Sequence, residues 1–210
     1  MIERFVASSV TGMARFVTGV RGNWTGCLPD PKPRVYFANH TSHGDFVLIW
    51  SVLPAHVRRL TRPVAGADYW LKDRFRRFVG ESVFKAVLID RTARPRESDP
   101  IALLASVLDA GSSLIFFPEG TRNTTDALLQ PLKTGLHHLA KARPDVELVP
   151  VWIDNLNRVM PKGEVIPIPL LCTVTFGTPM RLEETEDRPT FMARAREAML
   201  ALAPAKESET

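Results

Sequence analysis

Residues 34–52, RVYFANHTSHGDFVLIWSV, carry the clearest structural signal in the chain. The β-branched and aromatic run at 34–38 predicts a strand, and the mostly apolar run at 45–52 predicts a helix. The polar turn at 39–45 therefore lies where a strand ends and a helix begins. Such junctions hold active sites in α/β proteins, because ligands bind beyond the carboxyl ends of the strands.

The alternation of strands and helices continues on both sides of this stretch. Further strands are expected at 62–65, 85–90, 113–117, 147–153 and 172–176, and further helices at 2–20, 69–84, 99–110, 132–142 and 190–203. Residues 22–33 are rich in Gly, Pro, Asn and Asp, and we expect turns there. Several strands are almost continuously apolar, as in a sheet covered on both faces. The sequence therefore predicts an α/β domain with a mixed, mostly parallel sheet flanked by helices.

The composition limits the classes of protein. The 210 residues are 45% hydrophobic and 24% charged, which fits one globular domain with or without a short appendage. Cys27 and Cys172 belong to no C-x-x-C pair or Cys/His cluster, so we expect neither a disulfide framework nor a structural zinc site. We expect no membrane-spanning helix and no secretory signal.

The charge is unevenly distributed. The chain carries a net charge of +4, but the stretch from Arg58 to Arg91 alone holds nine basic and four acidic residues, a local net charge of +5. Such a stretch indicates an anionic partner, which the charge alone leaves open between phospholipid, a phosphate-bearing substrate and nucleic acid. A solvated helix face explains it equally well.

The predicted N-terminal helix is amphipathic. Its apolar residues recur at helical spacing: Ile2, Phe5, Val6, Val10, Met13, Phe16, Val17 and Val20. Its opposite face is polar: Arg4, Ser8, Thr11, Arg15 and Thr18. Such a helix lies in a bilayer interface with its apolar face buried in lipid, or packs on the core of its own domain. The pattern does not distinguish these two arrangements.

His40 and Asp45 are candidates for a catalytic dyad. Five residues apart, they would not face each other in a continuous helix, so His40 must lie on the entering turn. Ser42 would then be the N-cap and Asp45 the third helical residue, reaching back to the imidazole. In a dyad the carboxylate orients the imidazole, whose other nitrogen takes a proton from a nucleophile. Otherwise Asp45 only caps the helix and His40 satisfies a buried acceptor.

A second polar segment, FPEGTR at 117–122, follows the expected strand at 113–117. Gly120 allows close approach of the backbone to a ligand, and Arg122 suits a phosphate group. Glu119 is expected to accept hydrogen bonds from substrate hydroxyls or to orient a neighbour. Arg91 follows another strand end and can converge on the same phosphate. The alternatives are a surface ion pair for the segment and a solvated side chain for Arg91.

Taken together, these segments resemble the motifs of the glycerolipid acyltransferase superfamily, which includes the 1-acyl-sn-glycerol-3-phosphate and other lysophospholipid acyltransferases. The matching segments, in order, are Asn39, His40, Ser42 and Asp45 of N-H-x-S-x-x-D, Val87 to Arg91, Phe117 to Arg122, Lys133 to Gly135, and Leu148 to Val151. The resemblance covers roughly residues 34–178. Several motifs in the right order are far more specific than any one of them.

The resemblance implies a role for each matching residue. His40 corresponds to the general base and Asp45 to its orienting partner. The substrate-binding residues implied are Arg91, Glu119, Gly120, Thr121, Arg122, Lys133 and Pro150. It also implies the glycerol-3-phosphate acyltransferase-like fold. The chain would divide into an N-terminal membrane-interface helix (1–22), an acyltransferase domain (23–204) and a disordered tail (205–210).

The implied reaction moves an acyl chain from acyl-CoA or acyl carrier protein to the free hydroxyl of a lysophospholipid. The favoured acceptor is 1-acyl-sn-glycerol-3-phosphate, which would give phosphatidic acid. No metal or cofactor is expected beyond the thioester co-substrate. The expected partners are the membrane surface, the two substrates and in addition acyl carrier protein, with no nucleic acid. We expect a peripheral, monotopic protein on the cytoplasmic face of the inner (plasma) membrane.

Three alternatives remain open at this stage. The first is a different acceptor within the same chemistry, as in a lyso-ornithine lipid acyltransferase. The second is a non-catalytic lipid-binding module, which would not need His40 and Asp45 together. A metal-dependent hydrolase using His40, His43 and Asp45 lacks the further ligands of known metal motifs. We interpret His43 as a bystander and residues 154–164 as a surface loop.

Overall fold

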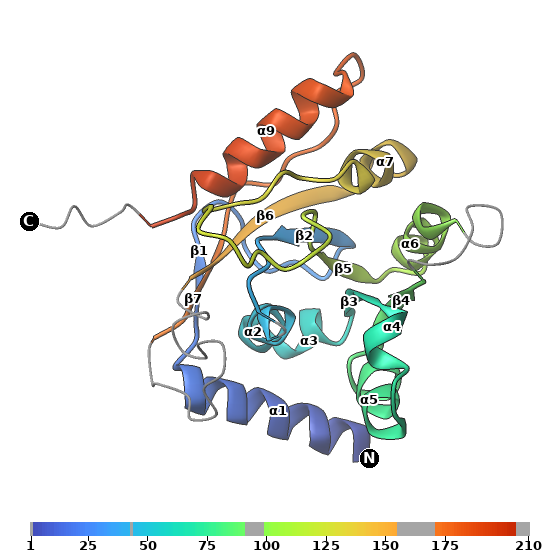
Figure 1. The fold of residues 1–210 in the computed structure, drawn as a ribbon, viewed down its shortest axis with the longest axis vertical. Helices are drawn as coiled ribbons and strands as arrows, with labels where there is room; N and C mark the ends of the chain where they lie inside the picture. Colours follow the sequence, from blue (N-terminus) through green and yellow to red (C-terminus); the bar gives the residue numbers. More distant parts are fainter. Residues whose placement is uncertain (1, 43, 91–98, 155–170, 205–210) are drawn as a thin grey trace, which may run out of the picture.

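The computed structural model describes residues 2–42, 44–90, 99–154 and 171–204. Seven strands form one sheet in the order β1-β7-β6-β2-β5-β3-β4 (Figure 1). The strands are β1 (Arg21–Trp24), β2 (Arg34–Ala38), β3 (Thr61–Gly66), β4 (Val87–Ile89), β5 (Ser113–Phe116), β6 (Glu147–Asp154) and β7 (Thr173–Phe176). Neighbouring strands are parallel except β6 and β7, which are antiparallel. The expectation of a mixed, mostly parallel sheet is confirmed.

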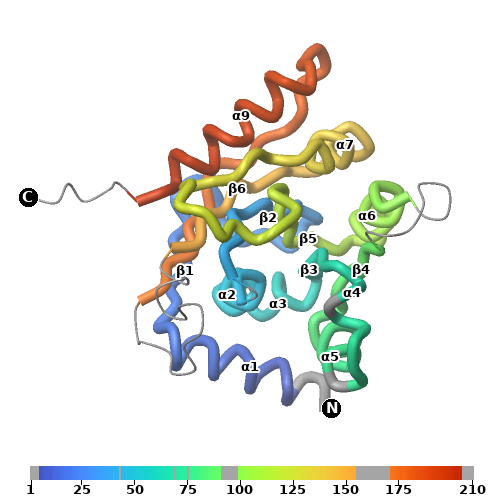
Figure 2. The backbone as a smooth tube through the Cα atoms, viewed as in Figure 1, coloured from blue at the N-terminus to red at the C-terminus, as the bar shows by residue number. Residues whose placement is uncertain are grey.

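Helices cover both faces of the sheet (Figures 1 and 2). They are α1 (Ile2–Thr18), α2 (Asp45–Val52), α3 (Ala55–Arg58), α4 (Ala67–Trp70), α5 (Arg74–Phe78), the π-helix η1 (Val79–Val83), α6 (Pro100–Asp109), α7 (Gly135–Ala142) and α9 (Arg188–Leu200). The side chains of β2 alternate between two cores: Tyr36 and Ala38 pack toward α2, and Val35 and Phe37 toward α6, α7 and α9. The sheet is therefore the middle layer of three, as its apolar strands require.

Local sequence explains where the two longest helices of the second face begin. Asp99 caps α6 by accepting hydrogen bonds from the amides of Ile101 and Ala102, and a proline occupies the first turn. Asp187 caps α9 in the same way through the amide of Thr190. An acidic N-cap followed by proline in the first turn is a strong start signal, because it satisfies free amides and removes one donor that would lack a partner.

Strand β1 was not predicted from the sequence, which indicated turns from Gly22 onward. Residues 21–24 form a parallel ladder with β7, in register from Arg21 opposite Thr173 to Trp24 opposite Phe176. The rings of Trp24 and Phe176 stack with centroids 3.8 Å apart. Pairing with a strand 150 residues away in the chain, rather than local propensity, makes this segment extended.

Other boundaries also differ from expectation. The helix expected at 69–84 is broken into α4, α5 and η1, and α7 begins at Gly135 rather than at residue 132. Within η1, a Cβ atom added at Gly80 would lie 2.8 Å from the indole ring of Trp70. The indole therefore packs directly on the backbone of η1, a contact that only glycine permits.

Helix α1 packs on the domain through polar as well as apolar residues. Thr11 and Thr18, which the sequence pattern places on the polar face, are buried, and their hydroxyls donate to the carbonyls of Ala7 and Ala14. Arg15 donates to the carbonyl of Ser51 at the end of α2, over 2.7 Å. Val10, at one edge of the predicted apolar face, also packs against the core, so the helix meets the domain through a mixed side. Among the described residues, no helix has the length and hydropathy needed to span a membrane.

The outer side of α1 carries large apolar groups. Phe5, Met13 and Phe16 are 74%, 67% and 89% exposed. All three belong to the apolar face that the sequence predicts. Large apolar side chains gathered on the outer side of one helix are unusual on the surface of a globular domain.

The fold predicts a difference in reactivity between the two cysteines. Cys172 is fully buried, and burial raises the pKa of its thiol to about 11. At pH 8 only about 0.1% of such thiols are ionised. Cys27 is partly exposed, and its pKa is raised as well. We expect iodoacetamide at pH 8 to alkylate Cys27 well before Cys172 in the folded protein, and both alike in denaturant, as followed by mass spectrometry. Equal rates in the folded protein would contradict the burial of β7.

Candidate functional site

The two polar segments meet because their strands are neighbours. β2 and β5 are parallel and adjacent, with Phe37 opposite Phe116, so residues 39–45 and 117–122 emerge at the same edge of the sheet. On the other side of β2, the side chain of Asn39 bonds both the carbonyl and the amide of Ile153 in β6, over 3.0 and 2.8 Å. Asn39 thus extends the β2–β6 pairing beyond Ala38 and fixes the point at which the chain turns toward His40.

His40 and Asp45 form the expected pair. His40 Nδ1 lies 2.8 Å from Asp45 Oδ2. The same oxygen accepts the amides of Thr41 and Ser42, at 2.7 and 2.9 Å. The side chain of Asp45 is 1% exposed and that of His40 is 20% exposed. With the carboxylate as acceptor, the ring proton belongs on Nδ1, and Nε2 carries the lone pair.

The capping expected at the start of α2 is wrong in detail. Gly44, not Ser42, is the residue before the helix, and Asp45 is its first residue rather than its third. Asp45 nevertheless reaches back because the turn at 40–42 directs two amides and the imidazole toward one carboxylate oxygen. The dyad geometry therefore comes from the turn, not from a capping box.

The segment after β5 holds His40 from three sides. The imidazole stacks on Phe117, with ring centroids 4.2 Å apart and planes 20° from parallel. The amide of His40 donates to Glu119 Oε1 over 2.7 Å, and its carbonyl accepts the amide of Asn123 over 2.6 Å. Backbone contacts of this kind leave no signature in a sequence, and the role of Asn123 was not anticipated.

Glu119 was expected to bind substrate or to orient a neighbour, and the structure gives its carboxylate two backbone partners. Oε1 accepts from His40, and Oε2 accepts the amide of Gln130 over 2.9 Å. The residue is 2% exposed. Burial raises the pKa of Glu119, while the two amides oppose this shift by stabilising the carboxylate.

Gly120, Thr121, Arg122 and Lys133 line the rim beside this buried group. Gly120 has a φ of +71°, and a Cβ atom there would lie 2.8 Å from Cδ and 2.9 Å from Nζ of Lys133. Thr121, Arg122 and Lys133 are exposed. In the part of the chain that the structure describes, neither Arg122 nor Lys133 has an ion-pair partner. Two cations beside a glycine turn are chemically suited to an anionic group.

Pro150 lies apart from this rim. It is buried within β6, opposite Phe37, and its carbonyl accepts the amide of Gly177. Leu148, two residues earlier, directs both its amide and its carbonyl to Met180 on the same side. The missing N–H of Pro150 therefore faces away from β2, so the ladder at the centre of the sheet is intact. Its position supports a role in packing.

Other expected residues fall outside the described part of the chain. Arg91 and His43 do so, as does nearly all of the loop expected at 154–164, of which only Asp154 is described. The described ranges contain no group of three or more His, Cys, Asp or Glu side chains placed to hold a metal ion.

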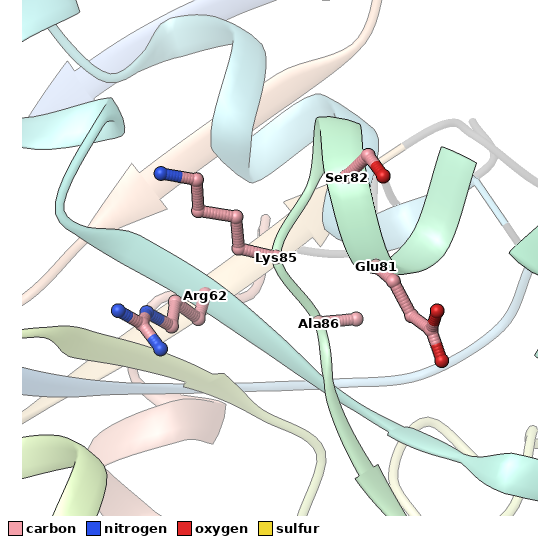
Figure 3. A pocket seen from close by; sticks show the side chains of 5 residues that line it. All are labelled: Arg62, Glu81, Ser82, Lys85 and Ala86. Carbon is pink, nitrogen blue, oxygen red and sulfur yellow. The ribbon is translucent and has the colours of Figure 1, made fainter. Parts of the chain in front are cut away.

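A separate hollow lies near the amino ends of β3 and β4. It has a volume of about 440 Å³ and is lined by Arg62, Glu81, Ser82, Lys85 and Ala86 (Figure 3). Arg62 and Lys85 lie near the starts of these parallel strands, whereas His40 follows the carboxyl end of β2. The hollow is therefore distinct from the dyad site.

Comparisons with known proteins identify one family. A family model described as Acyltransferase matches residues 25–154. A 1-acyl-sn-glycerol-3-phosphate acyltransferase from Chlamydomonas reinhardtii is 32% identical over 140 residues, covering 65% of this chain and 39% of the relative. One from Cocos nucifera is 28% identical over 160 residues (73% and 47%), and one from Limnanthes douglasii is 28% identical over 190 residues (83% and 60%). The chain thus spans about half the length of these relatives.

A solved structure has the same fold. The crystal structure of the 1-acyl-sn-glycerophosphate (LPA) acyltransferase PlsC from Thermotoga maritima aligns with a TM-score of 0.72 at 18% identity. The alignment covers 97% of this chain and 83% of that one. The arrangement of the central sheet and its flanking helices, N-terminal helix included, is therefore shared with a known acyltransferase fold.

Two glycines allow a matched test of the rim. Gly111 and Gly120 both have positive φ, but only Gly120 lies against Lys133. We expect Gly111→Ala and Gly120→Ala each to lower the free energy of unfolding by about 1–2 kcal/mol, the cost of a left-handed backbone for an L residue. Only Gly120→Ala should also weaken binding of a phosphate-bearing lysolipid, because the new methyl group displaces Lys133. Urea unfolding and lipid titration measure the two effects, and equal weakening in both variants would contradict this role for the rim.

Proposed function

The chain belongs to the acyltransferase family, and we propose that it transfers an acyl chain from a thioester donor to the free hydroxyl of a lysophospholipid. The proposed acceptor is 1-acyl-sn-glycerol-3-phosphate, which the reaction converts to phosphatidic acid. The observation that carries the proposal is the His40–Asp45 pair at the carboxyl edge of the sheet, with Nδ1 and Oδ2 2.8 Å apart. Three relatives are named as 1-acyl-sn-glycerol-3-phosphate acyltransferases, and their names support the same reaction.

The dyad supplies the base that the reaction needs. Nε2 of His40 takes the proton from the acceptor hydroxyl as its oxygen attacks the thioester carbonyl carbon, and Asp45 stabilises the imidazolium that forms. The C–O bond forms, the C–S bond then breaks, and the imidazolium returns the proton to the departing thiol. Because the substrate hydroxyl is the nucleophile, no serine or cysteine of the protein is acylated. The reaction as written requires no metal or cofactor beyond the thioester.

The rim residues are proposed to hold the acceptor phosphate. Arg122 and Lys133 provide two exposed cations, and Gly120 lets the backbone approach the ligand. Thr121 offers a hydroxyl, and Arg91 is proposed to complete the phosphate site. A phosphate acceptor suits this charge better than lyso-ornithine lipid, which has no phosphate. The donor is proposed to be acyl-CoA or acyl carrier protein.

We propose that the chain binds the membrane peripherally through α1. The outward Phe5, Met13 and Phe16 would enter the interface between headgroups and acyl chains. The segment at and just before α5 carries exposed basic residues, among them Lys72, Arg74 and Arg77. Helix α5 lies near the N-terminal end of α1, and α1 contacts η1 (Figure 1). Basic residues attract the anionic lipids of a cytoplasmic leaflet. This supports the cytoplasmic face of the inner membrane as the location.

The proposed division of the chain follows from the same features. Residues 1–22 would form the membrane-interface segment and residues 23–204 the acyltransferase domain. This boundary falls inside β1, so the last two residues of the segment already pair with β7 in the sheet. Residues 205–210, proposed as a disordered tail, lie outside the described part of the chain. Because Arg15 bonds to the last turn of α2, the interface helix is also an integral part of the domain's packing.

A first prediction tests the reaction and its base. Wild-type protein, incubated with labelled acyl-CoA and acyl carrier protein thioesters, should yield diacyl product from 1-acyl-sn-glycerol-3-phosphate. His40→Ala should lower the rate about 10²- to 10⁴-fold, the usual contribution of a general base. His56→Ala, which changes an exposed histidine of α3, is the matched control and should have wild-type activity.

The acceptor panel separates the alternatives. Product from lyso-ornithine lipid alone would keep the acyl transfer reaction but identify a different acceptor. If no donor–acceptor pair gives product and His40→Ala keeps its affinity for lipid, the chain is a lipid-binding module and not an enzyme. Loss of activity with a chelator would point to metal-dependent chemistry instead.

A second prediction concerns membrane binding. Phe16→Glu should weaken sedimentation with anionic vesicles by about 10- to 100-fold, since burying one phenylalanine contributes roughly 1.5–3 kcal/mol. Leu103→Glu is the control, because Leu103 is also exposed but lies on α6, in the layer on the other face of the sheet. Far-UV circular dichroism should show no change for either variant. If Phe16→Glu sediments like the wild type, α1 is not the membrane-binding element.

A further inference from the structure

The strands beside β2 leave backbone groups that need partners. Beyond Ala38 the chain of β2 has passed its last ladder pair, and β5 has ended at Phe116 and turned at Gly120. Buried backbone donors and acceptors are almost always paired, so the groups at 39–40 must find other partners. On the β6 side, the side chain of Asn39 pairs with the carbonyl and the amide of Ile153. On the β5 side, the carboxylate of Glu119 accepts the amide of His40.

We propose that Glu119 is a positioning residue for the general base, which it fixes through the backbone of His40 without touching the acceptor. This rests on the proposed function, in which His40 is the base. Each carboxylate oxygen of Glu119 accepts a hydrogen bond from one backbone amide, and the residue is 2% exposed. A group that binds an incoming lipid needs a free acceptor atom facing solvent. Arg122 and Lys133 are exposed, as such a role requires, and Glu119 is not.

The contact with His40 is one of several that orient the same imidazole. The amide of His40 is held by Glu119, its carbonyl by Asn123, its ring face by Phe117 and its Nδ1 by Asp45. Without an acceptor at Oε1, the amide of His40 is left without a partner and the turn at 40–42 loses its anchor on β5. The imidazole then shifts away from the carboxylate of Asp45. Misplacement of a reacting group by about 1 Å can lower a rate about 10²-fold.

The second oxygen explains why a glutamate is required. Oε2 accepts the amide of Gln130, so the carboxylate also closes the loop 121–131 back onto the sheet. A glutamine in its place has one acceptor oxygen, and its NH₂ group would face one of the two backbone amides. An aspartate keeps the charge but is one methylene shorter, so it cannot reach both amides without a shift of the backbone.

The experiment separates positioning from binding by a double-mutant cycle. Glu119→Gln is measured in the wild-type background and in His40→Ala, with kcat and acceptor KM determined in each. Positioning predicts that kcat falls about 10- to 100-fold when His40 is present, with acceptor KM changed less than about threefold. It also predicts that the residual rate of His40→Ala changes by less than about threefold, because residues that act as one unit are not additive. Arg122→Gln serves as the contrast and should raise acceptor KM.

Two controls keep the result specific. Glu186→Gln changes another carboxylate, which lies just before α9 and accepts hydrogen bonds from the amide of Glu183 and the side chain of Arg194. It has no contact with His40 or Asp45 among these bonds, and kcat should be unchanged. Glu119→Asp keeps the charge and should resemble Glu119→Gln. Full activity in Glu119→Asp would overturn the proposal in favour of a purely electrostatic role, and so would an equal fall in rate from Glu119→Gln with and without His40.

A substrate-free measurement distinguishes failure of this proposal from failure of the proposed function. In ¹⁵N-histidine-labelled protein, the Nδ1–H resonance of His40 reports its hydrogen bond to Asp45. We expect Glu119→Gln to shift or broaden this resonance, while the unfolding temperature shows that the variant is folded. An unchanged resonance in the folded variant would overturn the positioning role even if the wild type had no acyltransferase activity.

Discussion

The site depends on how three neighbouring strands come apart at one edge of the sheet. β2 lies between β6 and β5. The ladders with β5 and β6 end at Phe37 and Ala38, and His40 lies two residues beyond the second of these. Side chains take over the pairing: Asn39 on one side and Glu119 on the other. A parallel sheet creates this opening wherever the strand connections go to opposite sides, and ligands bind there for that reason. The residues that close the opening also decide where the imidazole points.

The dyad and the proposed membrane surface share a single short helix. α2 begins with Asp45, which receives His40, and its last turn offers the carbonyl of Ser51 to Arg15 of α1. Arg58 of α3 adds a contact to Thr11 on the same helix. α1 is therefore attached to the element that holds the carboxylate of the dyad. If α1 binds a bilayer as proposed, the depth at which it enters would set the height of His40 above the lipid surface.

Sequence reasoning succeeded where a local pattern and a tertiary contact agree. The run at 34–52 predicts the strand, the turn and the helix. A position of His40 on the turn allows its pairing with Asp45, but the spacing alone left that pairing open beside a simple helix cap. Sequence reasoning failed for β1, where Arg21, Gly22 and Asn23 have no strand pattern and extension depends on pairing with β7. The contacts of Glu119 were hidden for a related reason: its partners are amides of His40 and Gln130, and every residue except proline carries an amide. Side-chain identity cannot reveal a partner of that kind.

The orientation of α1 follows from its composition once its surroundings are considered. Its inward side carries Ala7, Val10 and two threonines. The buried threonine hydroxyls donate to carbonyls one turn earlier, so the helix approaches α2 with these hydroxyls paired. Its outward side exposes Phe5 and Phe16 almost fully. Leaving an aromatic side chain in water instead of burying it costs roughly 1.5–3 kcal/mol. An apolar surface that covered Phe5 and Phe16 would therefore stabilise the observed orientation of α1, which is the physical basis of the proposed role of this helix.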